Sequence, residues 1–177
     1  SVKAIVRHKY GSPDVLELQE VETPPLLDDQ VMIRVHAASV NPLDWHFLRG
    51  TPFVIRMTAG LVRPKRKILG ADVAGTVEAV AATVTRIQPG DEVFAAIPTL
   101  GTFAEYLCVP RNRVVLKPAN VTFEEAATGT AAALTALQGL RDKGHIERGH
   151  KVLINGAAGG VGTFAVQIAK SFGAEVT

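Results

Sequence analysis

The first part of the chain shows the alternation of apolar and polar positions that is typical of half-buried β-strands. Residues 2–8 (VKAIVRH) and 30–40 (QVMIRVHAASV) alternate in this way, and residues 71–87 are rich in Val and Thr. A short strand is expected between the turns GSPD and TPP, and two more strands are expected in 88–97 and 101–110. Several short strands at this spacing favour a β-barrel or β-sandwich.

Two features interrupt the strand pattern. Gly75 lies inside the strand predicted for 71–87 and indicates a bend or a bulge there. Residues 48–68 fit no regular period and are expected to form a long excursion. The basic run RPKRK (63–67) falls within this excursion. Such a run can steer an anionic cofactor or substrate, or it can simply solvate an exposed loop.

The pattern changes after residue 121. Thr122 and Glu125 have the spacing of a capping box in front of the Ala- and Leu-rich residues 124–143. Gly144 or Gly149 is expected to end this helical region. The change predicts two domains, a mostly β domain in 1–121 and the start of an α/β domain in 122–177.

The end of the chain predicts a β-α-β unit. Residues 150–156 (HKVLING) form a short apolar strand, residues 157–172 a turn and a helix, and residues 174–177 the start of a second strand, with Gly173 as the C-cap of the helix. The three-glycine spacing in this turn is that of a dinucleotide-binding fingerprint, whose helix N-terminus binds the pyrophosphate. The residues of the turn are Gly156, Ala157, Ala158, Gly159, Gly160, Val161 and Gly162.

Composition excludes several classes of function. The chain has 177 residues, a net charge of +2 and 47% hydrophobic residues, which predicts no nucleic-acid or membrane partner. No apolar run approaches the roughly 20 residues that span a bilayer, and the N-terminus shows no signal-peptide pattern. The single cysteine, Cys108, excludes an internal disulfide and a multi-cysteine zinc site, and it is expected to be buried. We therefore expect a cytoplasmic protein.

Five motifs, in order along the chain, resemble the medium-chain dehydrogenase/reductase superfamily and its zinc-free quinone oxidoreductase (zeta-crystallin-like) branch. They are SVNPLDWHFLRG (39–50), LGADVAGTVEAVAATVTRIQPGDEVFA (69–95), GTFAEYLCVP (101–110), AAALTALQGL (131–140) and AAGGVGTFAVQIAK (157–170). The resemblance implies a chaperonin-10-like (GroES-like) β-barrel followed by a truncated Rossmann β-α-β unit. Family members are about twice as long, so the chain is expected to be an N-terminal portion of a longer enzyme.

Two positions depart from the zinc-dependent alcohol dehydrogenases of the same superfamily. Asn41 stands where those enzymes have a catalytic Cys, and Gly70-Ala71-Asp72 stands where they have Gly-His-Glu. A catalytic zinc usually takes three protein ligands, commonly His, Cys or carboxylate side chains. The resemblance therefore implies an enzyme without zinc.

The resemblance also implies roles for four residues outside the glycine turn. Asn41 is expected to bind the nicotinamide amide or ribose, although it also suits a turn before Pro42. Asp44 and His46 are expected to be catalytic, Asp44 by orienting groups and His46 by donating a proton, and His46 is also expected to bind the cofactor. Helix capping and a surface position are the alternatives for these two residues. The hydroxyl of Thr135 is expected to meet the nicotinamide end, or else to bond the backbone within its own helix.

These expectations combine into one leading hypothesis and two others. The leading hypothesis is an oxidoreductase that uses NADPH, with NAD(H) as the alternative cofactor, to reduce a small quinone, enone or related carbonyl compound. A homodimer is expected at full length. The second hypothesis is a truncated, non-catalytic barrel module with an incomplete nucleotide site. The third is a zinc-dependent alcohol dehydrogenase, which measurable bound zinc would identify.

Overall fold

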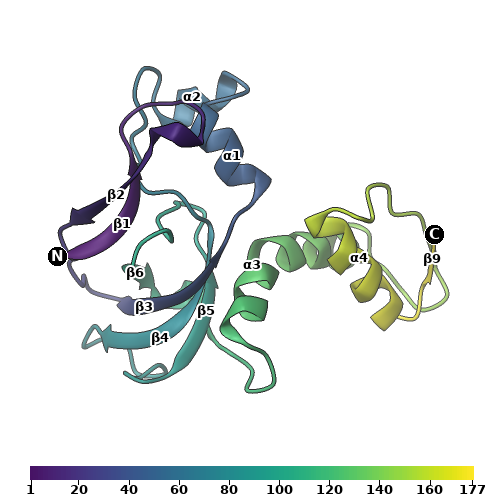
Figure 1. Cartoon of the computed structure of the whole chain (residues 1–177). Coiled ribbons are helices and arrows are strands. Elements are labelled where there is room, and N and C mark those ends of the chain that lie inside the picture. The colour runs from purple at the N-terminus through teal and green to yellow at the C-terminus, as the bar shows by residue number, and fades with distance from the viewer. The chain divides into compact units, whose positions relative to one another are not determined.

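The structure, a computed structural model, describes all residues from Ser1 to Thr177. It divides into two compact units, Ser1–Ala127 and Thr128–Thr177, and each is described by itself. The boundary between them falls inside helix α3 (Phe123–Leu137), whereas the sequence predicted it just before this helix (Figure 1).

A five-stranded antiparallel sheet forms the body of the first unit, with strand order β6-β3-β4-β5-β7 (Figure 1). The strands are β3 (Gln30–Ser39), β4 (Asp72–Val80), β5 (Glu92–Ala96), β6 (Tyr106–Pro110) and β7 (Val114–Leu116). Four of them confirm strands expected from the apolar alternation. Strand β7 has only three residues and was not predicted.

The first two strands form a separate antiparallel pair, β1 (Val2–Arg7) and β2 (Leu16–Val21), joined through a 3-10 turn at Pro13–Val15. Isolated bridges from Ala4 to Ala104 and from Val6 to Ile68 tie β1 to the rest of the unit. A second 3-10 turn, Arg111–Arg113, connects β6 to β7.

Apolar side chains from alternate strand positions fill the core of the sheet, as the two-residue period requires. The fully buried members are Val31, Ile33, Val73 and Val93. Gly75 pairs with Val35 at a register shift of β3, which confirms the predicted irregularity. A Cβ atom at Gly75 would overlap the backbone of Arg34, so only glycine fits this close approach of two strands.

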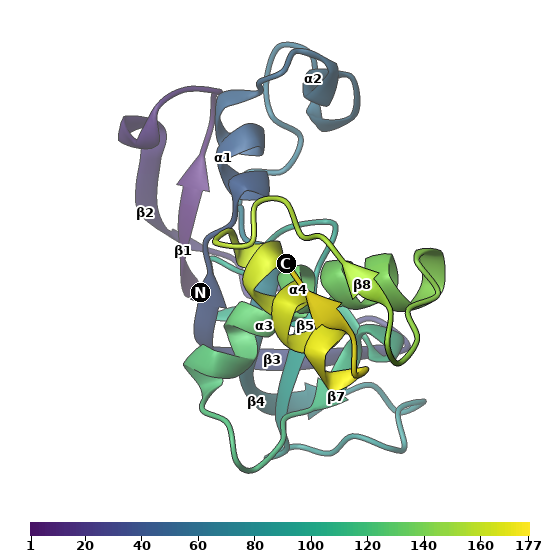
Figure 2. The same cartoon turned by 90° about the vertical axis from the view of Figure 1, so that its right-hand side faces the viewer.

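The excursion between β3 and β4 contains two short helices that the sequence did not predict, α1 (Pro42–Arg49) and α2 (Val54–Ala59). Figures 1 and 2 both show them together at one end of the first unit. The buried Arg7 donates to the carbonyl oxygens of Phe47 and Arg66 and therefore links β1 to both ends of the excursion. The charged residues of the basic run 63–67 are exposed, and their steering role stays a prediction.

The second unit contains the predicted β-α-β arrangement. Its strands β8 (Lys151–Val152) and β9 (Glu175–Val176) pair in parallel, and helix α4 (Gly160–Ser171) connects them (Figure 2). Gly173, with a φ of 79°, follows the C-cap residue Phe172 and turns the chain into β9. No helix of the structure has the length and apolar character that a membrane span needs.

The remaining helical region runs across the unit boundary. Thr122 and Glu125 form the predicted capping box, with reciprocal bonds of 2.9 and 3.1 Å between the backbone N–H of each residue and the side chain of the other. Helix α3 continues into a π-helical turn, Gln138–Lys143, which ends at Gly144. The helical region therefore ends at Gly144, the first of the two glycines that the sequence offered as its end.

Candidate functional site

A group of hydrogen-bonded polar side chains lies where β3 ends and where α1 and β4 begin. The ladder between β3 and β4 pairs Ser39 with Asp72, and Asn41 follows β3 as the N-cap of α1. The side-chain amide of Asn41 donates to Asp72 Oδ2 at 2.8 Å and to Ser39 Oγ at 3.0 Å. The hydroxyl of Ser39 donates to the same Asp72 oxygen at 2.7 Å.

The Asp72 carboxylate determines how the Asn41 amide is turned. Asp72 is 0% exposed, and an ionised carboxylate only accepts hydrogen bonds, so the NH2 group of Asn41 must face it. Hydrogen bonds of this kind offset the cost of burying the carboxylate. The amide oxygen of Asn41 is consequently directed away from Asp72, and the side chain is held in one orientation.

Asp44 joins α1 to the turn before β4. One carboxylate oxygen accepts from the backbone N–H of Asn41 at 2.8 Å, and the other accepts from the backbone N–H of Gly70 at 2.9 Å. Burial raises the pKa of Asp44, the charge of Asp72 adds to this rise, and the bonds from the Asn41 and Gly70 N–H groups lower it. These bonds support the capping alternative for Asp44, and its catalytic role stays a prediction.

His46 lies on the same helix, half-buried, beside Trp45. Its Nδ1 is 2.7 Å from the carbonyl oxygen of Thr51. Because a carbonyl oxygen only accepts, Nδ1 carries a hydrogen, and Nε2 is the ring nitrogen that can exchange a proton. The exposed Trp45 packs edge-on against this ring at 4.9 Å, and the Arg49 guanidinium lies 5.2 Å from the centre of the Trp45 ring.

The glycine turn of the second unit has the geometry that its spacing predicted. Gly156 adopts a φ of 77°, in the left-handed region that favours glycine, where the chain leaves β8. A Cβ atom on Gly162 would overlap the Gly156 carbonyl oxygen and would lie 2.7 Å from Ala157 Cα. Helix α4 therefore packs closely against the turn at Gly162, as the third glycine of the fingerprint allows.

The turn leaves open space at the start of α4. An added Cβ on Gly160 would meet nothing within 4 Å, and one on Gly159 would meet only the Gly156 carbonyl oxygen at 3.3 Å. Residues 156–161 of the turn, including Ala157, Ala158 and Val161, are exposed. The N–H groups of the first helical turn have no acceptor within the helix and point out of its N-terminus. A phosphate group fits such a site.

Thr135 is exposed on α3, and its hydroxyl donates to the Ala131 carbonyl oxygen at 2.7 Å. This bond is the within-helix alternative that the sequence left open. Its contact with a cofactor stays a prediction.

The structure brings Asn41, Asp44 and His46 together on α1, whereas Thr135 and the glycine turn belong to the second unit. Sequence reasoning missed Ser39 and Asp72 as the partners of Asn41. Both residues lie in predicted strands, 30–40 and 71–87, but only the antiparallel pairing of these strands, which the sequence does not state, places the end of one beside the start of the other.

The remaining candidates lie outside this cluster. Cys108 is half-buried on β6, 3.7 Å from the Pro24 carbonyl oxygen, and burial raises the pKa of its thiol. His36 stacks on Phe123 with ring centres 4.4 Å apart. The structure contains no group of three or more His, Cys, Asp or Glu side chains placed to hold a metal ion.

Comparisons with known proteins match this architecture. The protein-family model of the alcohol dehydrogenase GroES-like domain matches residues 27–119, which is more than half of the chain. The mouse protein named NAD(P)H oxidoreductase RTN4IP1, mitochondrial, is 39% identical over 98% of this chain and 48% of its own length. The 2-methylene-furan-3-one reductase of Solanum lycopersicum is 39% identical over 93% of this chain and 43% of its own length.

A solved structure shares the fold of both units. The Escherichia coli quinone oxidoreductase complexed with NADPH aligns with a TM-score of 0.83 and 29% identity, over 98% of this chain and 51% of that one. The chain thus spans about half the length of the proteins that it matches.

Proposed function

The chain belongs to the alcohol dehydrogenase GroES-like domain family of the medium-chain dehydrogenase/reductase superfamily, and we propose that it is part of a zinc-independent NAD(P)H oxidoreductase. In this proposal the enzyme transfers hydride to a quinone, an enone or a related carbonyl compound, and the chain supplies the barrel and the first part of the cofactor domain. The relatives named as reductases of such compounds support the substrate class.

The glycine turn is the observation that carries the proposal. The open space at Gly159 and Gly160 and the free N–H groups at the start of α4 suit a dinucleotide pyrophosphate. We assign the pyrophosphate to the turn from Gly156 to Gly162. NADPH is the expected cofactor and NADH the alternative. When bound, the nicotinamide supplies the hydride.

Asn41 is assigned to the nicotinamide end of the cofactor. Its amide oxygen is oriented by the bond from its NH2 group to Asp72, so it is available in one direction without loss of side-chain entropy on binding. Thr135 is proposed to meet the same end of the cofactor, although its hydroxyl now bonds within its helix.

Zinc independence is supported by the donors at the cluster. The side chain of Asn41 turns its NH2 group, which is not a metal ligand, toward the Asp72 carboxylate, and Ala71 offers no ligand atom. Without a metal ion, negative charge that develops on the substrate oxygen must be met by hydrogen-bond donors. We propose that His46 donates a proton from Nε2 while its Nδ1 stays bonded to the Thr51 carbonyl oxygen.

The proposal is tested by following NADPH oxidation by the full-length protein with a panel of quinones and enones. We expect turnover with at least one of them, and no turnover across the panel would overturn the proposal. His46→Ala should lower kcat by about 10²-fold if the imidazole acts as general acid. The matched control is His8→Ala, which removes an exposed histidine of β1–β2 and should leave kcat unchanged.

NADPH titration of the 177-residue chain and of the full-length protein distinguishes the enzyme from a non-catalytic barrel module. Trp45 is the only tryptophan of these 177 residues, and it lies beside His46, so its fluorescence can report NADPH binding near α1. We expect weak quenching or none by the 177-residue chain and saturable quenching by the full-length protein. No quenching in either would favour the barrel module. The cytoplasmic location and the homodimer stay predictions.

A further inference from the structure

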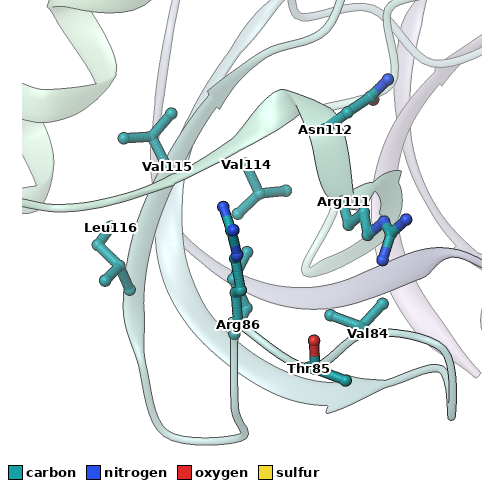
Figure 3. Close-up of a pocket in the computed structure, with 9 residues that line it drawn as sticks. Val84, Thr85, Arg86, Arg111, Asn112, Val114, Val115 and Leu116 are labelled. Atoms are coloured by element: carbon teal, nitrogen blue, oxygen red, sulfur yellow. The ribbon is translucent and has the colours of Figure 1, made fainter.

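A pocket lies in the first unit, between the loop that follows β4 and the segment that contains β7 (Figure 3). Its volume is about 690 Å³, within the usual range of pockets for small ligands. The Asn41 cluster is at the start of β4, and this pocket follows the end of the same strand. No residue of the Asn41 cluster lines the pocket.

One wall of the pocket is aliphatic. Val84, Ile87 and Val114 are buried at its base. Val115 and Leu116 also line it, yet they remain 56% and 54% exposed. A hydrocarbon group that covers these two half-exposed side chains would remove apolar surface from water, which favours binding.

The polar part of the pocket is cationic. Arg86 and Arg111 contribute guanidinium groups, Thr85 and Asn112 contribute neutral polar groups, and no Asp or Glu lines the cavity. Figure 3 shows the Arg86 side chain extending along the cavity toward Val114. The pocket therefore combines positive charge with an apolar wall.

The two arginines differ in their partners. Arg111 Nε pairs with Asp29 at 2.5 Å, and its guanidinium also donates to the Thr83 carbonyl oxygen at 3.1 Å. Arg86 is exposed and has no hydrogen bond, ion pair or ring contact in the structure. Its guanidinium is thus the free anion-binding group of the pocket, because its planar fork matches a carboxylate.

We propose that this pocket binds a small aliphatic carboxylate, with its carboxylate on Arg86 and its hydrocarbon chain against Val115 and Leu116. A neutral hydrocarbon would leave Arg86 unused, and an inorganic anion would leave the aliphatic wall uncovered. The inference does not depend on the proposed oxidoreductase function, because every residue that it uses belongs to the first unit and none belongs to the glycine turn.

Octanoate is the probe that tests this inference, with octan-1-ol as its uncharged counterpart and inorganic phosphate as the anion without a chain. Binding to the 177-residue chain is measured by calorimetric titration and by NMR shifts of the backbone amides, without nucleotide. We expect octanoate to bind saturably and to shift the amides of 84–87 and 114–116. Octan-1-ol and phosphate should bind more weakly.

Two variants with matched controls test the assigned contacts. Arg86→Gln should weaken octanoate binding about tenfold and leave octan-1-ol unaffected, whereas Arg63→Gln, at an exposed arginine of the excursion, should change neither. Leu116→Ser should weaken both ligands, and Leu18→Ser, at a 70% exposed leucine of β2, should not. The inference is overturned if octanoate fails to saturate at about 10 mM, if its amide shifts lie elsewhere, or if Arg63→Gln weakens it as much as Arg86→Gln.

Discussion

The Asn41 amide and the buried Asp72 carboxylate are joined by a hydrogen bond of 2.8 Å, although the two residues are 31 positions apart in the chain. The bond crosses from the N-cap of α1 to the first residue of β4. The bond therefore connects Asn41, which we assign to the cofactor, to the rigid sheet. It holds the Asn41 side chain in the orientation that cofactor binding requires.

Asn41→Asp should destabilise the chain by about 3–5 kcal/mol near neutral pH, because it places a second carboxylate against the buried Asp72 carboxylate in place of an amide that donates a hydrogen bond to it. The loss should shrink as the pH falls, since a proton shared by the two carboxylates removes their repulsion. Urea unfolding at several pH values measures both effects. Asn120→Asp is the matched control at an exposed asparagine, and an equal loss in both variants would contradict the role of Asp72.

Asp44 makes stability depend on pH in the opposite sense to an ordinary ion-paired carboxylate. Because burial raises its pKa in the folded state above the ordinary value of 3.8, the native state binds this proton more tightly than the unfolded chain does. The contribution of Asp44 to the free energy of unfolding is therefore complete below pH 3.8 and falls as the pH rises from there through the folded-state pKa.

Asp44→Asn tests this dependence. The variant should be about 1–3 kcal/mol less stable than the parent at low pH. Its NH2 group cannot accept a hydrogen bond, so one of the two backbone N–H groups that Asp44 now binds would lose its acceptor. The difference from the parent should narrow as the pH rises. Unfolding at pH values from 3 to 7 measures it, and the exposed Asp28→Asn variant controls for the lost negative charge. A difference that widens with pH would contradict the raised pKa.

Much of the fold was predictable because the period of apolar residues differs between strands and helices. The alternation in 2–8 and 30–40 predicted β1 and β3, and the Thr122–Glu125 spacing predicted the start of α3. The short elements were not predictable. Helix α2 and strand β7 have six and three residues, too few to establish a period, and each depends on a neighbouring element, α1 for α2 and β5 for β7.

The candidate site was predictable only in part, for a related reason. The glycine turn is local in sequence, so its three-glycine spacing predicted a tight turn at Gly156 and close packing at Gly162, and the structure has a left-handed Gly156 and a Gly162 without room for a Cβ atom. The partners of Asn41 are not local. Ser39 and Asp72 meet only through the pairing of β3 with β4, and a single sequence does not state which strands pair.

Cys108 should react slowly in the folded chain. Burial raises the pKa of its thiol, and the thiolate is the form that attacks an alkylating reagent. We expect alkylation by iodoacetamide to be at least about tenfold slower in the native chain than in urea at the same pH. Mass spectrometry of timed samples measures both rates. Equal rates in the two states would show that the thiol is freely accessible.

Gly162 and Gly160 lie two positions apart at the start of α4 and should respond differently to the same substitution. Gly162→Ala places a Cβ against the Gly156 carbonyl oxygen and 2.7 Å from Ala157 Cα, and neither backbone atom can move aside at low cost. The free energy of opening α4 should therefore fall by about 1–3 kcal/mol. Gly160→Ala meets nothing within 4 Å and should leave the stability unchanged or raise it by about 0.5 kcal/mol. Amide hydrogen exchange of α4 measures both variants, and NADPH binding by the full-length Gly160→Ala protein then reports on the open space alone. Similar hydrogen exchange in the two variants would mean that the turn does not pack against α4 as described.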